Sequence, residues 1–385
     1  MKRLLYISEV PVELSYAGAT LLYRLFEGYT ADKLTIVQTG LPTTGRRLKD
    51  VTYIQSSKEK IRLLGRLRNY TGGTALNIWS KRQIGRRLAK TVAQFCPEAV
   101  ISVTFGLSWL TAEAISRRHG IPLFLVLHDD LLSTENFGRE QGYIGEKFRQ
   151  AYVHAAECFC IGPQMERYYF ERYGRKGAVL YPSRGMNDKT FRVDWLVTGQ
   201  KRSLNFCYAG SIGTPDFIPM LDTIAALLGQ AGHTLTIFSK IPDHLLAGYG
   251  HFRQPHVTIR PLVHPDELKE YLKACVDVNV LLNSFDQEQS FRLNFSSKIV
   301  DYTAVDLPVL FWGAPSSGIY KWFDACNYPC LITEKSGDRL AEEIGNLEKA
   351  AYRKQLADQL QVMADATFGF ERNFTVLKES INGVS

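Results

Sequence analysis

Short apolar runs alternate with longer amphipathic runs along most of this 385-residue chain. Runs such as "FLVL" (124–127) and "VLFW" (309–312) are apolar at every position, so neither face of the segment is polar. A strand of this kind is buried on both faces, as in a parallel sheet that helices cover on each side. The pattern therefore predicts an α/β protein with doubly wound parallel sheets.

The alternation occurs twice, in two halves that a polar, irregular linker separates at residues 184–203. Two such halves form two Rossmann-like domains facing a central cleft, with ligands at the carboxyl ends of the strands. Strands are expected at 3–8, 33–39, 99–105, 121–130, 157–162 and 177–183, and then at 204–210, 233–239, 257–263, 276–284, 309–312 and 330–334. Helices are expected at 19–29, 106–120, 163–174, 215–232 and 264–275, and in a tail from about 337 to 380.

The composition, 45% hydrophobic and 22% charged, is that of an ordinary globular protein. No stretch of about 18 apolar residues occurs, so we expect no transmembrane helix, and the apolar run after Arg3 is too short for a signal peptide. Seven cysteines, mostly in apolar runs, favour buried, reduced thiols in a cytosolic protein. Their spacing does not match a zinc site, so no metal is expected.

The net charge of +7 is concentrated in one window, residues 58–90, which holds ten Lys or Arg and one acid. Apolar residues alternate with the basic ones there, and the rest of the chain carries a charge of −2. Such a segment suits an anionic membrane surface or an anionic acceptor, and it would place the protein peripherally on the inner face of the membrane. A solvated helical face is the plain alternative, and nucleic acid is the less favoured partner.

The stretch "NFSSKIVDYTAVDLPVLFWG" (294–313) carries the main candidate site. It places Ser296, Ser297 and Lys298 at the start of a predicted helix, and unpaired N–H groups at a helix start favour an anion. Asp301, one turn further, cannot bind phosphate but can accept hydrogen bonds from sugar hydroxyls. The stretch therefore suggests a nucleotide diphosphate, and an ordinary capped helix is the alternative.

Other loops supply further candidates at strand ends. The loop "YAGSIGTPDF" (208–217) places Gly210, Ser211 and Gly213 where backbone N–H groups can approach a phosphate, or where they form a plain turn. His128 and Asp129 follow a buried strand beside Asp130 and can contact a sugar, or can serve as structural hydrogen-bonding groups and caps. Two further candidates are Gly18 in "SYAGAT", where small residues allow close approach, and Arg292, which offers a fork for phosphate oxygens.

In this order the motifs resemble the glycosyltransferase B fold, and specifically the family 4-like retaining glycosyltransferases. The resemblance covers most of the chain through "HDD", "CIGPQMERYYFERYG", "FCYAGSIG" and "SSKIVDYTAVDLPVLFWG". It implies an acceptor-side domain at 1–185, a nucleotide-sugar-binding domain at 186–365, and a last helix at 366–385 that crosses back to the first domain.

The resemblance also implies roles for particular residues. Ser296, Ser297 and Lys298 match the diphosphate-binding helix start, and Asp301 matches the acid that holds the ribose hydroxyls. His128 matches the histidine that touches the donor sugar, and Gly18 the acceptor-side glycine near the phosphates. Ser239 and Val263 fall where the family lodges the base.

Two departures separate this chain from the family pattern. The family pattern has a second acid separated from Asp301 by seven intervening residues, and Leu293 takes its place here. The loop "GSIGTPDF" lacks the usual cations, which Arg292 and Lys298 can supply instead. The sequence thus predicts a hexosyltransferase that moves a sugar from a UDP- or GDP-linked donor to a glycan or lipid-linked acceptor in surface polysaccharide or glycoconjugate synthesis. It implies no permanently bound cofactor. A nucleotide-sugar epimerase of the same fold and an inactive scaffold protein are the alternatives.

Overall fold

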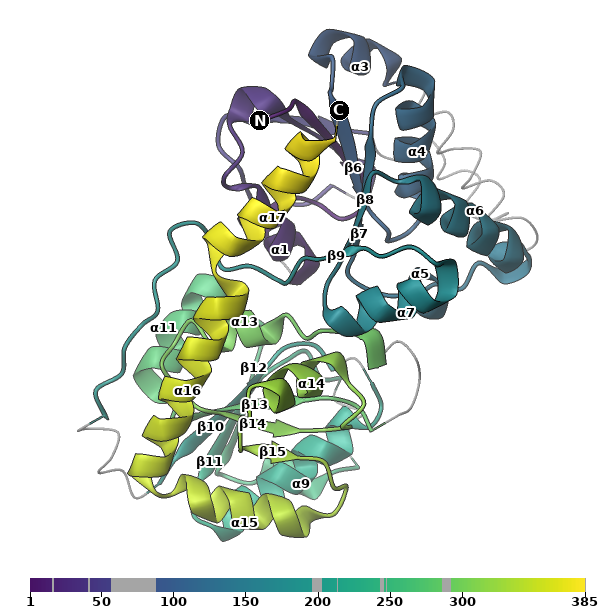
Figure 1. The fold of residues 1–385 in the computed structure, drawn as a ribbon. Coiled ribbons are helices and arrows are strands. Elements are labelled where there is room, and N and C mark those ends of the chain that lie inside the picture. The colour runs from purple at the N-terminus through teal and green to yellow at the C-terminus, as the bar shows by residue number, and fades with distance from the viewer. Residues whose placement is uncertain are drawn as a thin grey trace. The chain divides into compact units, whose positions relative to one another are not determined.

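The computed structural model describes residues 1–15, 17–40, 42–56, 88–195, 203–212, 214–242, 246, 248–285 and 292–384 (Figure 1). These residues form two compact units. We call Met1–Met186, Leu293–Phe295 and Phe370–Ser385 the N-unit, and Asn187–Arg292 and Ser296–Gly369 the C-unit. The chain therefore passes from one unit to the other four times, and two of these passages lie next to the predicted phosphate-binding stretch.

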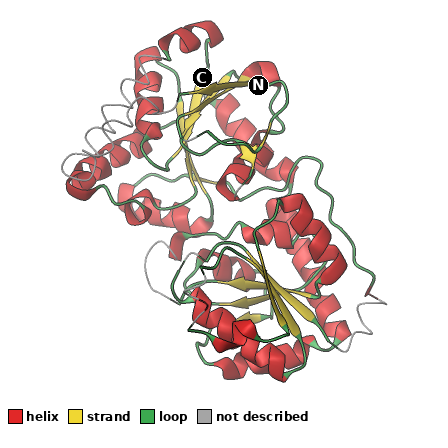
Figure 2. Ribbon diagram, turned by 180° about the vertical axis from the view of Figure 1, so that it is seen from behind, coloured by secondary structure: helices red, strands yellow, loops and turns green. Residues whose placement is uncertain are grey.

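The N-unit is built on a seven-stranded parallel sheet with the order β5-β3-β1-β6-β7-β8-β9. Helices lie on both sides of this sheet (Figure 2). The sheet strands are β1 (Leu4–Ser8), β3 (Leu34–Gln38), β5 (Thr52–Gln55), β6 (Ala99–Val103), β7 (Leu123–Leu127), β8 (Glu157–Cys160) and β9 (Ala178–Val179), and β2 (Glu13–Leu14) pairs separately with β4 (Arg46–Arg47). The helices are α1 (Ala17–Phe26), α3 (Ala89–Phe95), α4 (Ser108–His119), α5 (Leu131–Thr134), α6 (Gln141–His154), α7 (Pro163–Tyr173) and α17 (Phe370–Gly383), with short 3-10 turns η1 (Ala31–Lys33) and η4 (Gly138–Glu140).

The helix ends follow the local sequence signals. Pro163 opens α7, where its missing N–H costs nothing, and Gly174 ends it with a left-handed φ of 69°. Gly120 ends α4 in the same way, with a φ of 64°. These boundaries confirm the predicted helices at 106–120 and 163–174, whereas the strand predicted at 177–183 shrinks to the two residues of β9.

The last helix, α17, packs within the N-unit and is drawn in yellow in Figure 1. Its side chains Leu377 and Ile381 join the buried cluster that also contains Phe26 of α1 and Leu4 of β1. The ring of Phe374 lies so close to Gly28 that a Cβ at that glycine would collide with it. The C-terminal residues are therefore part of the core around the first strand.

The C-unit has a six-stranded parallel sheet with the order β12-β11-β10-β13-β14-β15, again with helices on both faces (Figure 2). Together with the N-unit sheet, it confirms the predicted doubly wound architecture. The strands are β10 (Asn205–Ala209), β11 (Thr234–Phe238), β12 (Val257–Arg260), β13 (Val278–Leu282), β14 (Val309–Trp312) and β15 (Leu331–Ile332). The helices are α9 (Phe217–Gln230), α11 (Pro265–Cys275), α13 (Lys298–Tyr302), α14 (Gly318–Ala325), α15 (Gly337–Leu347) and α16 (Ala350–Phe368), with η5 (Gly250–Arg253) as a 3-10 turn.

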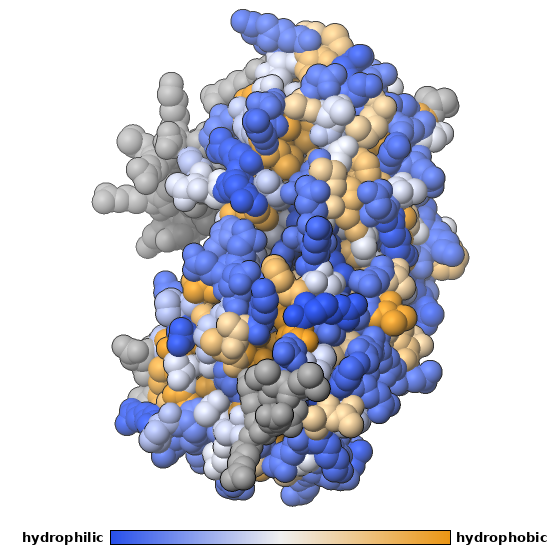
Figure 3. All heavy atoms as spheres, turned by 90° about the vertical axis from the view of Figure 1, so that its left-hand side faces the viewer, coloured by the Kyte–Doolittle hydropathy of each residue, from blue (hydrophilic) through white to orange (hydrophobic). Residues whose placement is uncertain are grey.

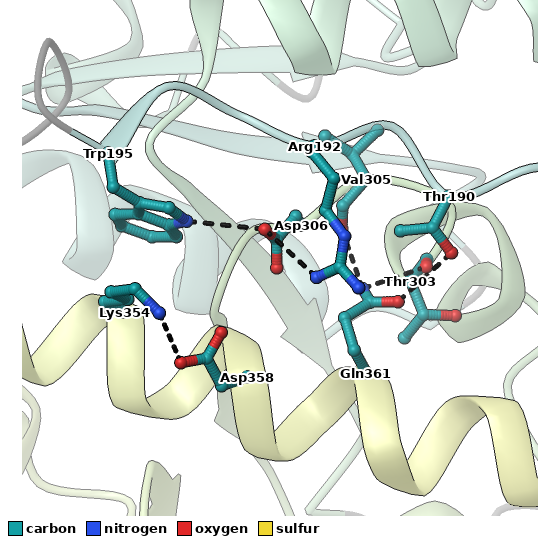
Figure 4. Close-up of polar contacts among 9 residues, drawn as sticks. All are labelled: Thr190, Arg192, Trp195, Thr303, Val305, Asp306, Lys354, Asp358 and Gln361. Atoms are coloured by element: carbon teal, nitrogen blue, oxygen red, sulfur yellow. Dashed lines mark hydrogen bonds and ion pairs between the residues drawn. The ribbon is translucent and has the colours of Figure 1, made fainter.

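Residues 190–195 of the predicted linker are tied to the C-unit rather than left as a free connection (Figure 4). Phe191 forms a parallel bridge with Val305, just after α13. Arg192 and Trp195 approach the buried carboxylate of Asp306, each at 3.4 Å. Gln361 of α16 donates to the carbonyls of Thr303 and Val305 at 3.1 and 3.2 Å, so the turn that ends α13 is fixed from two sides.

All seven cysteines are free thiols, of which Cys158, Cys160, Cys207 and Cys330 are buried and Cys96 and Cys275 are exposed. The described helices include none long and apolar enough to cross a membrane. On the face drawn in Figure 3, hydrophilic side chains predominate and apolar ones are scattered among them. Of the basic window 58–90, residues 58–87 lie outside the described residues.

Candidate functional site

The strand order of the C-unit sheet indicates where a ligand would bind, at the carboxyl ends of two central strands. The chain runs outward from β10 through β11 to β12, and outward in the opposite direction from β13 through β14 to β15. β10 and β13 are therefore the two strands at which the order reverses, and ligands of open α/β sheets bind beyond the carboxyl ends of such strands. Asp216, at the start of α9, connects the two loops because it accepts hydrogen bonds from Ser284 Oγ at 2.7 Å and from Phe285 N at 3.0 Å.

Lys298, the first residue of α13, reaches back to the end of β10. Its Nζ donates a hydrogen bond to the hydroxyl of Tyr208 at 2.7 Å and lies 4.6 Å from the centre of the Tyr208 ring and 5.5 Å from that of Phe217. Within the described part of the chain it forms no ion pair with a carboxylate. Burial lowers the pKa of Lys298 to about 8, since the charged form loses solvation.

Gly210 follows β10 and makes room for this lysine. Its φ of 144° lies in a region that side chains rarely adopt, and an added Cβ would overlap Cε of Lys298. The next turn of α13 holds the same loop, because the hydroxyl of Tyr302 accepts from Ala209 N at 2.7 Å. The structure thus brings two predicted residues together, Gly210 and Lys298, although 87 residues separate them.

The helix start at 296–298 differs from the prediction in one respect. α13 has only five residues, and the N–H groups of Ile299 and Val300 donate to the carbonyls of Ser296 and Ser297 at 3.3 and 3.1 Å. These donors are therefore already used, and the Lys298 ammonium is the main positive charge that this helix offers. The hydroxyls of Ser296 and Ser297 have no hydrogen-bond partner among the described residues.

The other donor-side candidates lie at several places on the C-unit. Asp301 is half-buried on α13, and Ser211 is exposed, with its carbonyl accepting from Tyr208 Oη at 2.8 Å. Ser239 follows β11; only 3% of it is exposed, and its hydroxyl has no partner in the part of the structure that is described. Val263 is half-buried after β12. Arg292 is exposed and makes no ion pair with a described residue, and Gly213 is outside the described residues.

On the N-unit, His128 and Asp129 follow β7 as predicted, and both are half-buried. Burial lowers the pKa of His128 to about 4, so the imidazole is neutral at pH 7. Burial, and then the neighbouring charge of Asp130, raises the pKa of Asp129. Asp130 itself accepts hydrogen bonds from Ser133 and, at 2.6 Å, from Tyr169 Oη, so it has the structural role that was the alternative for these acids.

The sequence did not mark two further acids of the N-unit, Glu9 and Glu135. The pKa of Glu135 is raised by burial first and then by the charges of Glu9 and Asp129. Glu9 follows β1 and accepts from Leu107 N at 3.1 Å and Ser108 Oγ at 3.3 Å at the start of α4. No motif marks these residues, because their proximity depends on the order of β1, β6 and β7 in the sheet.

Gly18 and Leu293, the two other residues that the sequence singled out, also lie in the N-unit. Gly18 lies inside the first turn of α1 rather than in the loop before it. Leu293, which replaces an acid of the family pattern, belongs to the N-unit and is only 7% exposed. Phe295 beside it packs edge-on against Tyr181 with ring centres 5.3 Å apart. An acid at position 293 would be buried here, so the departure from the pattern coincides with a packing position.

The described residues contain no group of three or more His, Cys, Asp or Glu side chains that could hold a metal ion.

No protein-family model matches the sequence, and no curated protein matches it. Solved structures do match the whole chain. HepE from Anabaena, in complex with UDP and glucose, has a TM-score of 0.71 at 14% identity, with 100% of both chains covered.

Trehalose-6-phosphate synthase, OtsA, matches with a TM-score of 0.67 at 8% identity, covering 100% of this chain and 99% of that one. The UDP-forming α,α-trehalose-phosphate synthase of Burkholderia vietnamiensis has a TM-score of 0.66 at 10% identity, covering 99% and 100%. The chain has the glycosyltransferase B fold. We call the carboxyl ends of β10 and β13, where the strand order reverses, the switch point of the C-unit. Gly210 and Lys298 lie there, and the sequence predicted both as donor-site residues.

Proposed function

We propose that this protein is a glycosyltransferase that moves a hexose from a nucleotide-diphosphate sugar to an acceptor hydroxyl. The observation that carries the proposal is the ammonium of Lys298 at the switch point of the C-unit, beside Gly210 and without an ion pair to a described carboxylate. The diphosphate leaving group gains negative charge as the glycosidic bond breaks. A cation held in place before the reaction stabilises that charge without a metal ion.

The remaining donor contacts are proposed from the same edge. The hydroxyls of Ser296 and Ser297 donate to phosphate oxygens, and Asp301 accepts from the ribose hydroxyls. Ser239 and Val263 contact the base, and this assignment is supported by the buried hydroxyl of Ser239, which has no hydrogen-bond partner among the described residues. Gly18, Ser211, Gly213 and Arg292 are retained as candidate donor-site residues. HepE is similar in fold and its structures hold UDP with glucose or UDP-glucose, so UDP is proposed ahead of GDP.

On the N-unit, the proposed roles are those of a hydroxyl-binding edge. Because His128 is neutral at pH 7, its imidazole can donate one hydrogen bond and accept another, which suits a sugar hydroxyl. Asp129, with its raised pKa, is a stronger proton acceptor than an ordinary aspartate. The resemblance to retaining enzymes implies that the leaving phosphate takes the proton of the acceptor, with His128 and Asp129 orienting the reactants.

A thermal-shift panel tests the donor assignment, because a ligand that binds the native state raises its melting temperature. UDP and UDP-glucose are expected to raise it by several degrees, GDP by less, and none of them in Lys298→Ala. Lys354→Ala is the matched control, since Lys354 is exposed and pairs with Asp358 on α16 (Figure 4). If no nucleotide diphosphate or nucleotide sugar shifts the melting temperature of the unmutated protein, the proposed function is wrong.

The acceptor is proposed to be a glycan or lipid-linked sugar in surface polysaccharide or glycoconjugate synthesis, with the basic window 58–90 on an anionic membrane. Flotation with vesicles that contain anionic lipid tests the membrane contact, and vesicles of neutral lipid are the control. Binding to anionic vesicles that disappears at high salt is expected. Absence of binding at low salt would refute the membrane contact and leave the donor assignment standing.

A nucleotide-sugar epimerase is the second candidate, and the raised pKa values of Asp129 and Glu135 favour it. Two carboxyl groups with raised pKa values are stronger proton acceptors than ordinary carboxylates, which suits removing and returning a proton. The two activities separate in an NMR assay of UDP-hexoses without acceptor. An epimer that accumulates there supports the epimerase, whereas a product that requires an added acceptor supports the transferase.

A further inference from the structure

The position of Lys298 depends on a tyrosine that the sequence did not single out. Tyr208 is fully buried at the end of β10, and its hydroxyl accepts the hydrogen bond from Lys298 Nζ at 2.7 Å. The same hydroxyl donates its own proton to the carbonyl of Ser211 at 2.8 Å. The phenol therefore has a fixed orientation, with an oxygen lone pair directed at the ammonium.

The contact holds the lysine without neutralising it. Burial raises the pKa of Tyr208 far above neutrality, so the phenol carries no negative charge. The ring faces of Tyr208 and Phe217 attract the ammonium through their quadrupoles, and this attraction leaves the full positive charge in place. An aspartate or glutamate in the same place would instead cancel the charge that a diphosphate needs.

We propose that Tyr208 is a positioning residue of the donor site, which holds the Lys298 ammonium in the orientation that meets the diphosphate. This inference rests on the proposed function. A lysine side chain has a flexible four-carbon stem and an ammonium with three N–H donors. If nothing fixes this side chain, it loses conformational entropy each time a ligand binds. Tyr208 fixes it in advance, and Gly210 supplies the space that its stem occupies.

If Tyr208 positions Lys298, it should affect how the affinity for a diphosphate depends on pH. A tyrosine with only a structural role would not. The pKa of Lys298 is about 8 in the free protein, and a bound diphosphate raises it because opposite charges favour the ammonium. Well below pH 8 the lysine is protonated with or without ligand, so its contribution to affinity is constant. Above pH 8 binding takes up a proton, so affinity falls, by at most about tenfold per pH unit. Without the tyrosine hydroxyl the ammonium loses an acceptor, and the fall begins at a lower pH.

Calorimetric titration of UDP at pH 7 and at pH 9 tests the inference on the full chain, using Tyr208→Phe, Lys298→Ala and the double variant. Tyr208→Phe keeps the ring and removes only the hydroxyl. We expect it to weaken UDP binding about tenfold, the usual effect of losing one hydrogen bond to a charged group, and to move the pH dependence downward. In the Lys298→Ala background the same change should have no effect, because Tyr208 acts through the lysine.

Tyr328→Phe is the matched control, since this buried hydroxyl bridges the N–H and carbonyl of Val309 in the same sheet. It should lower the melting temperature but leave the pH dependence of UDP binding unchanged. If Tyr208→Phe binds UDP as the unmutated protein does, with the same pH dependence, while Lys298→Ala loses binding, the inference is wrong and the proposed function stands. If the unmutated protein binds neither UDP nor GDP, the proposed function fails and the inference with it.

Discussion

The carboxyl edges of the two sheets have the same topology and opposite electrostatics. In the C-unit, the loop after β10 receives the ammonium of Lys298, which contacts aromatic rings and a neutral hydroxyl. In the N-unit, the corresponding end of the sheet holds a neutral His128 and two acids with raised pKa values. Burial and then the charge of Asp130 raise the pKa of Asp129, whereas burial and then the charges of Glu9 and Asp129 raise the pKa of Glu135. One edge therefore suits an anion, and the other suits hydroxyl groups.

Under the proposed function, this difference lets one architecture, used twice, take a donor and an acceptor of different chemistry. Both edges expose carboxyl strand ends, where loop residues can change without disturbing the sheet. Which ligand an edge accepts is then decided by a few charged side chains and their neighbours. If the comparison is correct, substitutions at the C-unit edge should affect the donor, and substitutions at the N-unit edge should affect the acceptor.

The largest effect is expected for Lys298→Ala. Removal of the ammonium should lower the transfer rate about 100-fold or more, because a preorganised charge at the leaving group is lost. UDP affinity should fall in parallel, as measured by calorimetry, with Lys354→Ala unchanged. An active Lys298→Ala variant would break the comparison, since the positive edge would then have no role in the reaction.

An intermediate effect is expected for Asp129→Asn. The rate of transfer should fall about tenfold and the KM for the acceptor should rise, while UDP affinity stays the same, because the change is confined to the N-unit edge. Steady-state kinetics with varied acceptor would detect it. Loss of UDP binding in this variant would contradict the division of roles between the two edges.

The same variant should be more stable than the unmutated protein at pH 7. The pKa of Asp129 is raised in the folded state, so ionisation of this group disfavours folding, and the penalty develops as the pH rises from the unfolded pKa through the folded one. Asparagine removes the charge, and the melting temperature should rise by about 1–3 °C at pH 7 and not at pH 3. A lower melting temperature at both pH values would mean that Asp129 is a structural acid like Asp130.

The smallest effect is expected for Arg192→Ala. Its ion pair with Asp306 is long, at 3.4 Å, and the arginine side chain is 65% exposed, so the loss of stability should be below about 1 kcal/mol. This contact holds the turn after α13, so UDP affinity tests more directly than stability whether the contact affects Lys298. We expect UDP affinity to change less than twofold. A larger loss would mean that the linker segment controls the position of Lys298.

Much of the fold could be predicted from the sequence, because local signals specify it. The apolar runs at 99–103 and 123–127 became β6 and β7, and the glycines at 120 and 174 end α4 and α7 where they were expected. The strand β5, the helix α6 and the short length of α13 were not predicted. A half-exposed edge strand such as β5 and a one-turn helix such as α13 carry weak periodic patterns, so the sequence alone does not specify them. This reason does not extend to α6, which has 14 residues.

The sequence by itself determined the order of strands and helices, the identity of Lys298 and Gly210 as candidates, and the resemblance to a two-domain fold. Only the tertiary structure decided that Tyr208 holds Lys298, that Asp130 is tied to Tyr169, and that burial and the charge of Glu9 raise the pKa of Glu135. The physical reason is that a parallel sheet places the ends of distant segments side by side. A hydrogen bond or a pKa depends on these neighbours in space, and they are separated in the chain by tens of residues.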